Sequence, residues 1–176
     1  MQILIIVVAM LATMALAGGM MYLLVKRYFD NEQKERLLQM KIDERRETLK
    51  VVTPIRLQAY ERMALFLERI SPDSLVLRCY QPGMDLKLLQ GVMTKNIRDE
   101  WEHNLSQQVY LAPGTWARIR EAKDEMVNLV NSSAVTLTGT DDPTRLAATI
   151  FASAAKHLPT DKALEELHKE INELFG

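Results

Sequence analysis

Residues 85–110, DLKLLQGVMTKNIRDEWEHNLSQQVY, decide the fold class of this chain. Apolar side chains recur in this stretch every three or four residues, a spacing that gathers them on one face of an α-helix. The members of this inner stripe are Leu86, Leu89, Met93, Ile97 and Trp101. A helix that is apolar on one face has to cover that face with another element, so the stretch predicts helices packed on helices.

Four other amphipathic segments surround this stretch in the sequence, and each has a recognisable start. Thr53 and Pro54 predict a helix with threonine as its N-cap and proline as its first residue. Further helix starts are expected at Thr115, Asp142 and Thr160. The sequence therefore predicts an all-α fold with a compact bundle of about five helices. The expected apolar face of the last helix consists of Leu164, Leu167, Ile171 and Leu174.

Two short stretches depart from the helical pattern. LVLRCY, residues 75–80, and AVTLTG, residues 134–139, alternate in the way of short strands. They leave open a minimal two-stranded ribbon beside the helices, although two strands alone are marginally stable.

The composition narrows the range of partners. The 176 residues carry 22 basic and 23 acidic side chains, so the formal charge of −1 provides no bulk attraction for nucleic acid, which we do not expect as a partner. The single cysteine, Cys79, cannot form a disulfide within the chain. A lone thiol fits a reducing compartment better than an oxidising one.

The first 25 residues have the composition of a transmembrane anchor. Residues 3–25, ILIIVVAMLATMALAGGMMYLLV, contain no charge. As a helix they would measure about 35 Å, enough to cross a hydrocarbon core of about 30 Å. The alternative is a signal peptide cleaved after ALA at residues 15–17. No basic residue precedes the apolar run and Lys26 and Arg27 follow it, which favours an uncleaved anchor with its C-terminal side in the cytoplasm and its N-terminus outside.

The expected anchor also contains a spacing that occurs in membrane-helix contacts. Ala15 and Gly19 are four residues apart, and small residues at this spacing let two membrane helices approach closely. The spacing therefore indicates self-association of the chain through this face. The alternative is that the spacing arose by chance, as it often does for small residues, and that this face contacts only the lipid bilayer.

Residues 26–52 form a charged connector between the anchor and residues 53–176. The connector mixes basic and acidic residues, with pairs such as Glu32 and Arg36 at helical spacing. Apolar residues at Leu38, Ile42, Leu49 and Val52 follow a short heptad pattern that Arg45 interrupts. A sustained coiled coil needs a longer pattern, so we expect a solvated helical stalk.

Two Glu-x-x-His motifs raise the question of a metal site. Glu100 and His103 share one side of the second expected helix, and Glu165 and His168 share one side of the last. Paired motifs of this kind build di-iron sites in helical bundles when all their side chains point inward. Only Glu100 falls on an apolar stripe, so a metal site with Glu100 and His103 is the lesser alternative.

Glu100 instead suggests a polar contact between helices. The carboxylate is expected on the inward side, and Lys123 lies among the apolar residues of the following helix. Because a buried charge without a partner is costly, we predict a Glu100–Lys123 or Glu100–Arg120 pair, or else side chains that stay wet at the edge of the stripe. Trp101 is expected in the core rather than on a binding surface.

Motifs for catalysis are absent from the sequence. The chain has no glycine-rich phosphate loop, no nucleophile elbow, and no cysteine and histidine close in sequence. We therefore expect no cofactor and no catalytic activity.

Two stretches of the chain resemble a known family. Residues 97–131, IRDEWEHNLSQQVYLAPGTWARIREAKDEMVNLVN, and residues 56–72, RLQAYERMALFLERISP, are similar to small single-pass proteins from Bacteroidota that share a domain of unknown function. The resemblance implies a bacterial inner membrane as the location of the chain. It supplies no catalytic or binding residues.

The sequence thus favours a membrane-anchored interaction or scaffold protein, an accessory subunit of an inner-membrane assembly whose protein partner is another subunit or a second copy. A metal-dependent enzyme or metal sensor that uses Glu100 and His103 is one alternative. A sensor of a small ligand or lipid is another, because the alanine-rich helix that starts at Asp142 could leave a pocket in the bundle.

Overall fold

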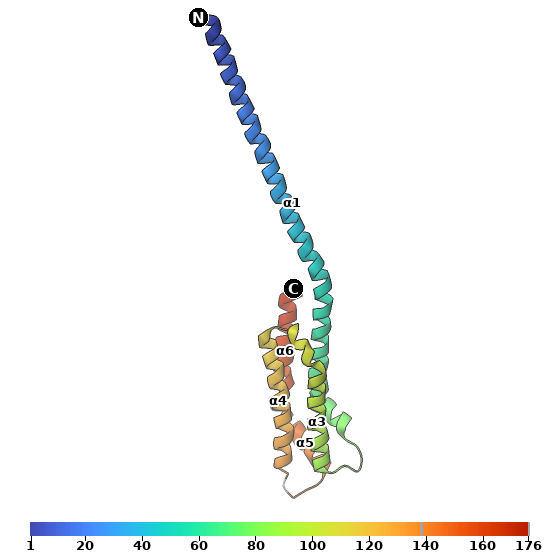
Figure 1. Cartoon of the computed structure of the whole chain (residues 1–176). Coiled ribbons are helices and arrows are strands. Elements are labelled where there is room, and N and C mark those ends of the chain that lie inside the picture. The colour runs from blue at the N-terminus through green and yellow to red at the C-terminus, as the bar shows by residue number, and fades with distance from the viewer. Residues whose placement is uncertain (138, 176) are drawn as a thin grey trace. The chain divides into compact units, whose positions relative to one another are not determined.

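The computed structural model describes residues 1–137 and 139–175, and all of their regular structure is helical (Figure 1). Seven helices and no strand within these residues confirm the predicted all-α class. The helices are α1 (Gln2–Ile70), α2 (Pro72–Cys79), α3 (Leu86–Asn104), the 3-10 helix η1 (Leu105–Val109), α4 (Pro113–Val135), α5 (Pro143–Ala154) and α6 (Pro159–Phe175). The chain divides into two compact units, residues 1–52 and residues 53–176.

The first unit is a single helical segment, the N-terminal part of α1. Its expected ion pair is present, with Arg36 Nη2 at 2.6 Å from Glu32 Oε1. The four apolar residues of the heptad pattern, Leu38, Ile42, Leu49 and Val52, are exposed. Within the described part of the chain, no helix is both long enough and apolar enough to cross a membrane. The side chains of Leu4, Val8, Ala9 and Ala12 lie outside the described residues, and the anchor remains a prediction.

The expected helix start at Thr53 is wrong, because α1 runs through Pro54 without interruption. Proline lacks a backbone N–H and so removes one hydrogen bond from the interior of a helix. Strong helix formers on both sides, such as Leu49 before it and Leu57 after it, continue the helix past this loss. Thr53 is the first residue of the second unit.

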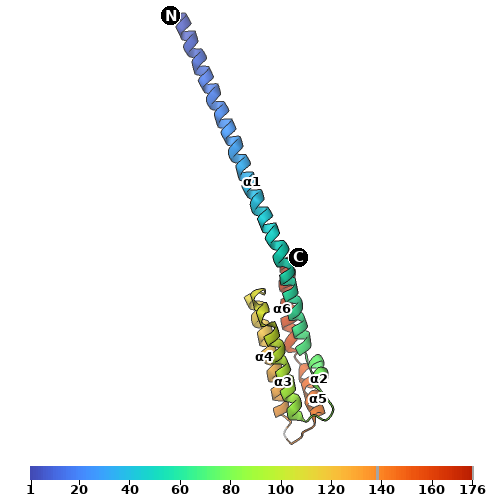
Figure 2. The same ribbon diagram turned by 45° about the vertical axis from the view of Figure 1, so that its right-hand side comes forward.

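The second unit is a bundle in which α4 packs against α3, α5 and α6, as both views show (Figures 1 and 2). The predicted stripe of α3 is buried from Leu86 to Ile97, and Trp101 is half-buried. The Trp101 ring stacks on Trp116 with 4.6 Å between ring centroids, so it belongs to the edge of the core. The other buried apolar residues include Ala59, Met63, Phe66 and Ile70 of α1, Ile119, Met126 and Val130 of α4, Leu146 and Ile150 of α5, and Ala163 and Leu167 of α6.

The two-stranded ribbon is absent from the described residues. The first expected strand is part of α2, where Leu75, Val76 and Cys79 are buried at helical spacing. Pro72 at the first position and Asp73 in the first turn favour a helix start there, and this signal outweighs the short alternation. The second expected strand begins inside α4 and ends at Gly139 with φ +86°; its residue 138 lies outside the described residues.

The predicted helix starts of the bundle have mixed outcomes. Asp142 is the N-cap of α5 and its carboxylate accepts a hydrogen bond from the Thr144 N–H at 2.9 Å, as expected. The prediction for Thr115 is wrong, because α4 already begins at Pro113 and Thr115 is buried in its first turn. The helix expected from residue 85 to 110 changes to the tighter η1 after Asn104.

Candidate functional site

Glu100 faces the junction of α1 and α2 rather than α4. Its Oε1 lies 2.7 Å from Arg69 Nη2 in the last turn of α1 and 3.3 Å from Arg78 Nη1 of α2. Arg78 also donates to the Arg69 carbonyl at 2.8 Å and to Asn96 Oδ1 at 3.0 Å. These contacts hold α2 against the end of α1 and against α3. The Arg78 guanidinium also lies at the C-terminus of α1, where a positive charge is stabilising.

The predicted pairing of Glu100 with Lys123 or Arg120 is therefore wrong. The Lys123 ammonium pairs with Asp124 at 2.5 Å and lies 5.4 Å from the centroid of the Trp101 ring. Arg120 is exposed on α4. The physical reason is that two guanidinium groups from α1 and α2 already surround the carboxylate, an arrangement that depends on α2 being a helix.

The Glu100 and His103 positions do not assemble a metal site. Both line a shallow surface hollow together with Asp99 and with Arg62 and Arg69, and the positive charges of the two arginines oppose a metal cation. Within the residues described, no three His, Cys, Asp or Glu side chains lie close enough together to hold a metal ion.

A polar cluster that the sequence interpretation missed is centred on Glu170 of α6. The carboxylate is buried, and its Oε1 accepts hydrogen bonds from the Tyr60 hydroxyl at 2.8 Å, the Ala112 N–H at 2.9 Å and Arg56 at 3.3 Å. Arg56 also donates to the Tyr110 carbonyl at 3.1 Å. The cluster joins α1, the start of α4 and α6, so its contacts are structural.

The environment of this cluster shifts the titration of Tyr60. Burial, followed by the hydrogen bond to Glu170, raises the pKa of Tyr60 to about 12. The hydroxyl therefore remains a neutral donor to the carboxylate at physiological pH. The raised pKa disfavours the phenolate form that a tyrosine base would need.

Cys79, the single cysteine of the chain, also lies in an environment that disfavours its thiolate. It is buried on the inner face of α2, and burial raises its pKa, an effect that Arg78 partly opposes. Because the thiolate is the reactive form, this environment disfavours nucleophilic chemistry.

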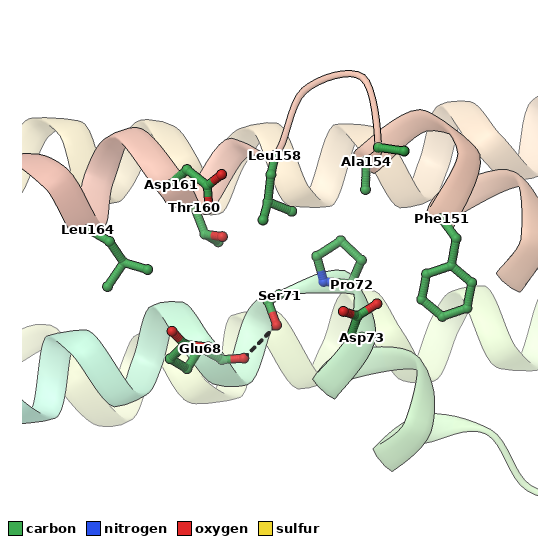
Figure 3. Close-up of a pocket in the computed structure, with 11 residues that line it drawn as sticks. Glu68, Ser71, Pro72, Asp73, Phe151, Ala154, Leu158, Thr160, Asp161 and Leu164 are labelled. Atoms are coloured by element: carbon green, nitrogen blue, oxygen red, sulfur yellow. Dashed lines mark hydrogen bonds between the residues drawn. The ribbon is translucent and has the colours of Figure 1, made fainter.

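A groove lies between the α1–α2 junction and the α5–α6 segment (Figure 3). Its volume is about 500 Å³. Apolar side chains form much of its lining: Pro72, Phe151, Ala154, Leu158 and Leu164. This size lies within the range of ligand clefts in proteins.

The charged lining of the groove is acidic. Glu68, Asp73 and Asp161 contribute carboxylates from α1, α2 and α6, whereas none of the described residues that line the groove is a lysine or arginine. None of the ion pairs between described residues includes one of these three carboxylates. The groove thus combines an apolar surface with negative charges that are accessible to a ligand.

Ala15 and Gly19 lie exposed on α1 in the first unit, with nothing within 4 Å of the position of a Cβ at Gly19. The self-association expected of them stays a prediction.

Comparison with known proteins places the chain in a family. No curated protein and no solved structure matches it. A family model, described as a family of unknown function, matches residues 1–174 and so covers both compact units. The chain therefore belongs to the family of unknown function DUF7935.

Proposed function

We propose that the protein is a membrane-anchored interaction protein, an accessory subunit of a bacterial inner-membrane assembly without catalytic activity of its own. The observation that carries this proposal is the uncharged segment 3–25. Its described large apolar side chains are exposed, among them Ile3, Leu16 and Leu24. Apolar surface of this extent is costly in water, and a lipid bilayer is the environment that removes this cost.

The polar contacts of the bundle support an interaction role over catalysis. Glu100 is neutralised by two arginines, and Glu170 accepts three hydrogen bonds within the fold. Catalytic groups need access to a substrate and a suitable pKa, whereas Tyr60 and Cys79 are buried with raised pKa values.

The charges beside the segment suggest its orientation. Lys26 and Arg27 follow it directly, and basic residues concentrate on the cytoplasmic side of membrane helices. Residues 53–176 would then lie in the cytoplasm with the N-terminus outside. In this arrangement the groove of the bundle faces cytoplasmic partners.

Extraction of membranes at alkaline pH tests the anchor. We expect the full chain to stay in the membrane pellet and a Leu11→Arg/Leu16→Arg variant to move to the supernatant, because each charge at the centre of a span costs about 3 kcal/mol. The matched control is Leu37→Arg/Leu38→Arg in the connector, which should stay in the pellet. Wild-type protein in the supernatant would contradict the proposal.

A further inference from the structure

We propose that the acidic groove of the bundle docks a basic amphipathic segment of a partner protein. The inference rests on the proposed interaction function and names the chemistry of the partner. The groove lies between the α1–α2 junction and the start of α6, with Ser71, Pro72 and Asp73 facing Leu158, Thr160 and Asp161 (Figure 3).

The apolar part of the groove provides the contact for the apolar face of such a segment. Phe151 of α5 is 37% exposed, although a phenyl ring in a bundle of this kind is usually covered. Leu158 and Leu164 are half-buried beside it, so each retains apolar surface that a partner can cover. Amphipathic helices bind grooves by placing apolar side chains at such positions.

The charges determine the kind of segment. Asp73 and Asp161 lie in the first turns of α2 and α6, where they also stabilise the helix starts. The two helix N-termini contribute only about half a positive charge each, so the groove with three carboxylates stays clearly negative. Lysine and arginine, whose apolar stems can lie along Phe151 while their charged ends reach the carboxylates, complement this surface.

Glu68, unlike Asp73 and Asp161, does not stabilise the start of a helix. It lies in the last turn of α1, where the negative end of the helix dipole disfavours a carboxylate. Its neighbour Ser71 donates to the Glu68 backbone carbonyl at 2.8 Å, and not to the carboxylate. The Glu68 carboxylate is therefore the best single position at which to separate partner binding from helix stability.

Fluorescence anisotropy of a labelled amphipathic peptide, built from leucine and lysine at helical spacing, tests the docking. The full chain is kept in a neutral maltoside detergent, a condition that serves whether or not segment 3–25 spans a membrane. We expect the peptide to bind the protein above a detergent blank, and a peptide with glutamate in place of lysine not to bind. Raised salt should weaken the binding.

Two variants and one control locate the peptide. Glu68→Lys should weaken binding about fivefold, since it replaces an attraction by a repulsion. Phe151→Ala should weaken it about tenfold through lost apolar contact. The matched control Glu173→Lys makes the same charge change at an exposed position of α6, far from Asp161 and outside the groove, and should leave binding unchanged.

Three outcomes would overturn the docking proposal: no binding above the blank, equal binding of the glutamate peptide, or equal weakening by Glu173→Lys and Glu68→Lys. Circular dichroism of each variant reports whether it remains folded. Should Phe151→Ala unfold, the comparison of Glu68→Lys with Glu173→Lys decides alone. Failure here leaves the anchor untouched, because alkaline extraction tests that claim separately.

Discussion

Replacement of Glu170 by alanine should destabilise the bundle more than any exposed substitution on the same helix. The carboxylate is 8% exposed, and its loss leaves the Tyr60 hydroxyl and the Ala112 N–H without their acceptor. It also removes the ion-pair partner of Arg56, whose side chain is 29% exposed. Breaking a buried pair from one side costs about 3 kcal/mol, at the lower end of the usual range because Arg56 can still reach water.

Thermal unfolding of the full chain in detergent, followed by circular dichroism, measures this loss. A cost of about 3 kcal/mol corresponds to a fall in Tm of roughly 10 °C for a bundle of this size. Glu170→Gln keeps an oxygen acceptor for Tyr60 and Ala112 and should lose only about 1 kcal/mol.

The matched control is Glu173→Ala, which removes an exposed carboxylate from the same helix and should change stability by less than about 0.5 kcal/mol. If Glu170→Ala and Glu173→Ala have the same Tm, the hydrogen bonds of Glu170 do not hold the bundle together and the structural role assigned to the cluster is wrong.

Three further predictions follow from the site. Because the pKa of Tyr60 is raised to about 12, the protonated hydroxyl contributes its full stabilisation below pH 10, and this stabilisation is lost as the pH rises through 12. Unfolding curves of Tyr60→Phe should therefore lack the loss of stability that the wild type shows over this alkaline range. Glu100→Ala should lower the free energy of unfolding by about 1 kcal/mol, because it removes two ion pairs whose arginines can still reach water, whereas Glu102→Ala, on the exposed side of α3, should cost less than about 0.5 kcal/mol in denaturant titrations. Buried Cys79 should react with a thiol reagent only after unfolding, and rapid labelling of the folded chain would contradict its assigned environment.

Local sequence rules were sufficient for part of the fold. The stripe of α3 was predicted residue by residue because helical periodicity places Leu86, Leu89, Met93 and Ile97 on one face whatever lies opposite. The start of α5 was predicted because Asp142 caps the helix through its own backbone neighbours.

The orientation of α6 depends on tertiary contacts that periodicity does not contain. Of the expected face, Leu167 is buried and Leu164 and Ile171 pack against the core, but Leu174 is exposed. Ala163 and Glu170, which were not expected on this face, are buried. Residues distant in sequence, Tyr60 among them, donate to Oε1 of buried Glu170, whereas its Oε2 is buried without a hydrogen-bond partner among the described residues. In the sequence, the burial of Glu170 was indicated only by its position on the same helical face as Leu167 and Ala163, which lie three and seven residues before it.

The partners of Glu100 were missed for a related reason. Their prediction rested on the inward position of Glu100 on its helix and of Lys123 on the next. The start signal at Pro72 makes residues 72–79 a helix that brings Arg78 beside the carboxylate. The acidic groove was not predictable either, since Glu68, Asp73 and Asp161 come from three separate helices that meet only in the folded bundle.

The mass of the native complex tests the central claim of a membrane-anchored interaction protein most directly. Tagged full-length protein is purified from native membranes in mild detergent, and the eluted complex is weighed and its subunits are identified. The account predicts recovery from the membrane fraction together with another subunit at near-equal stoichiometry. Recovery from the soluble fraction as a 20.1 kDa monomer would contradict it.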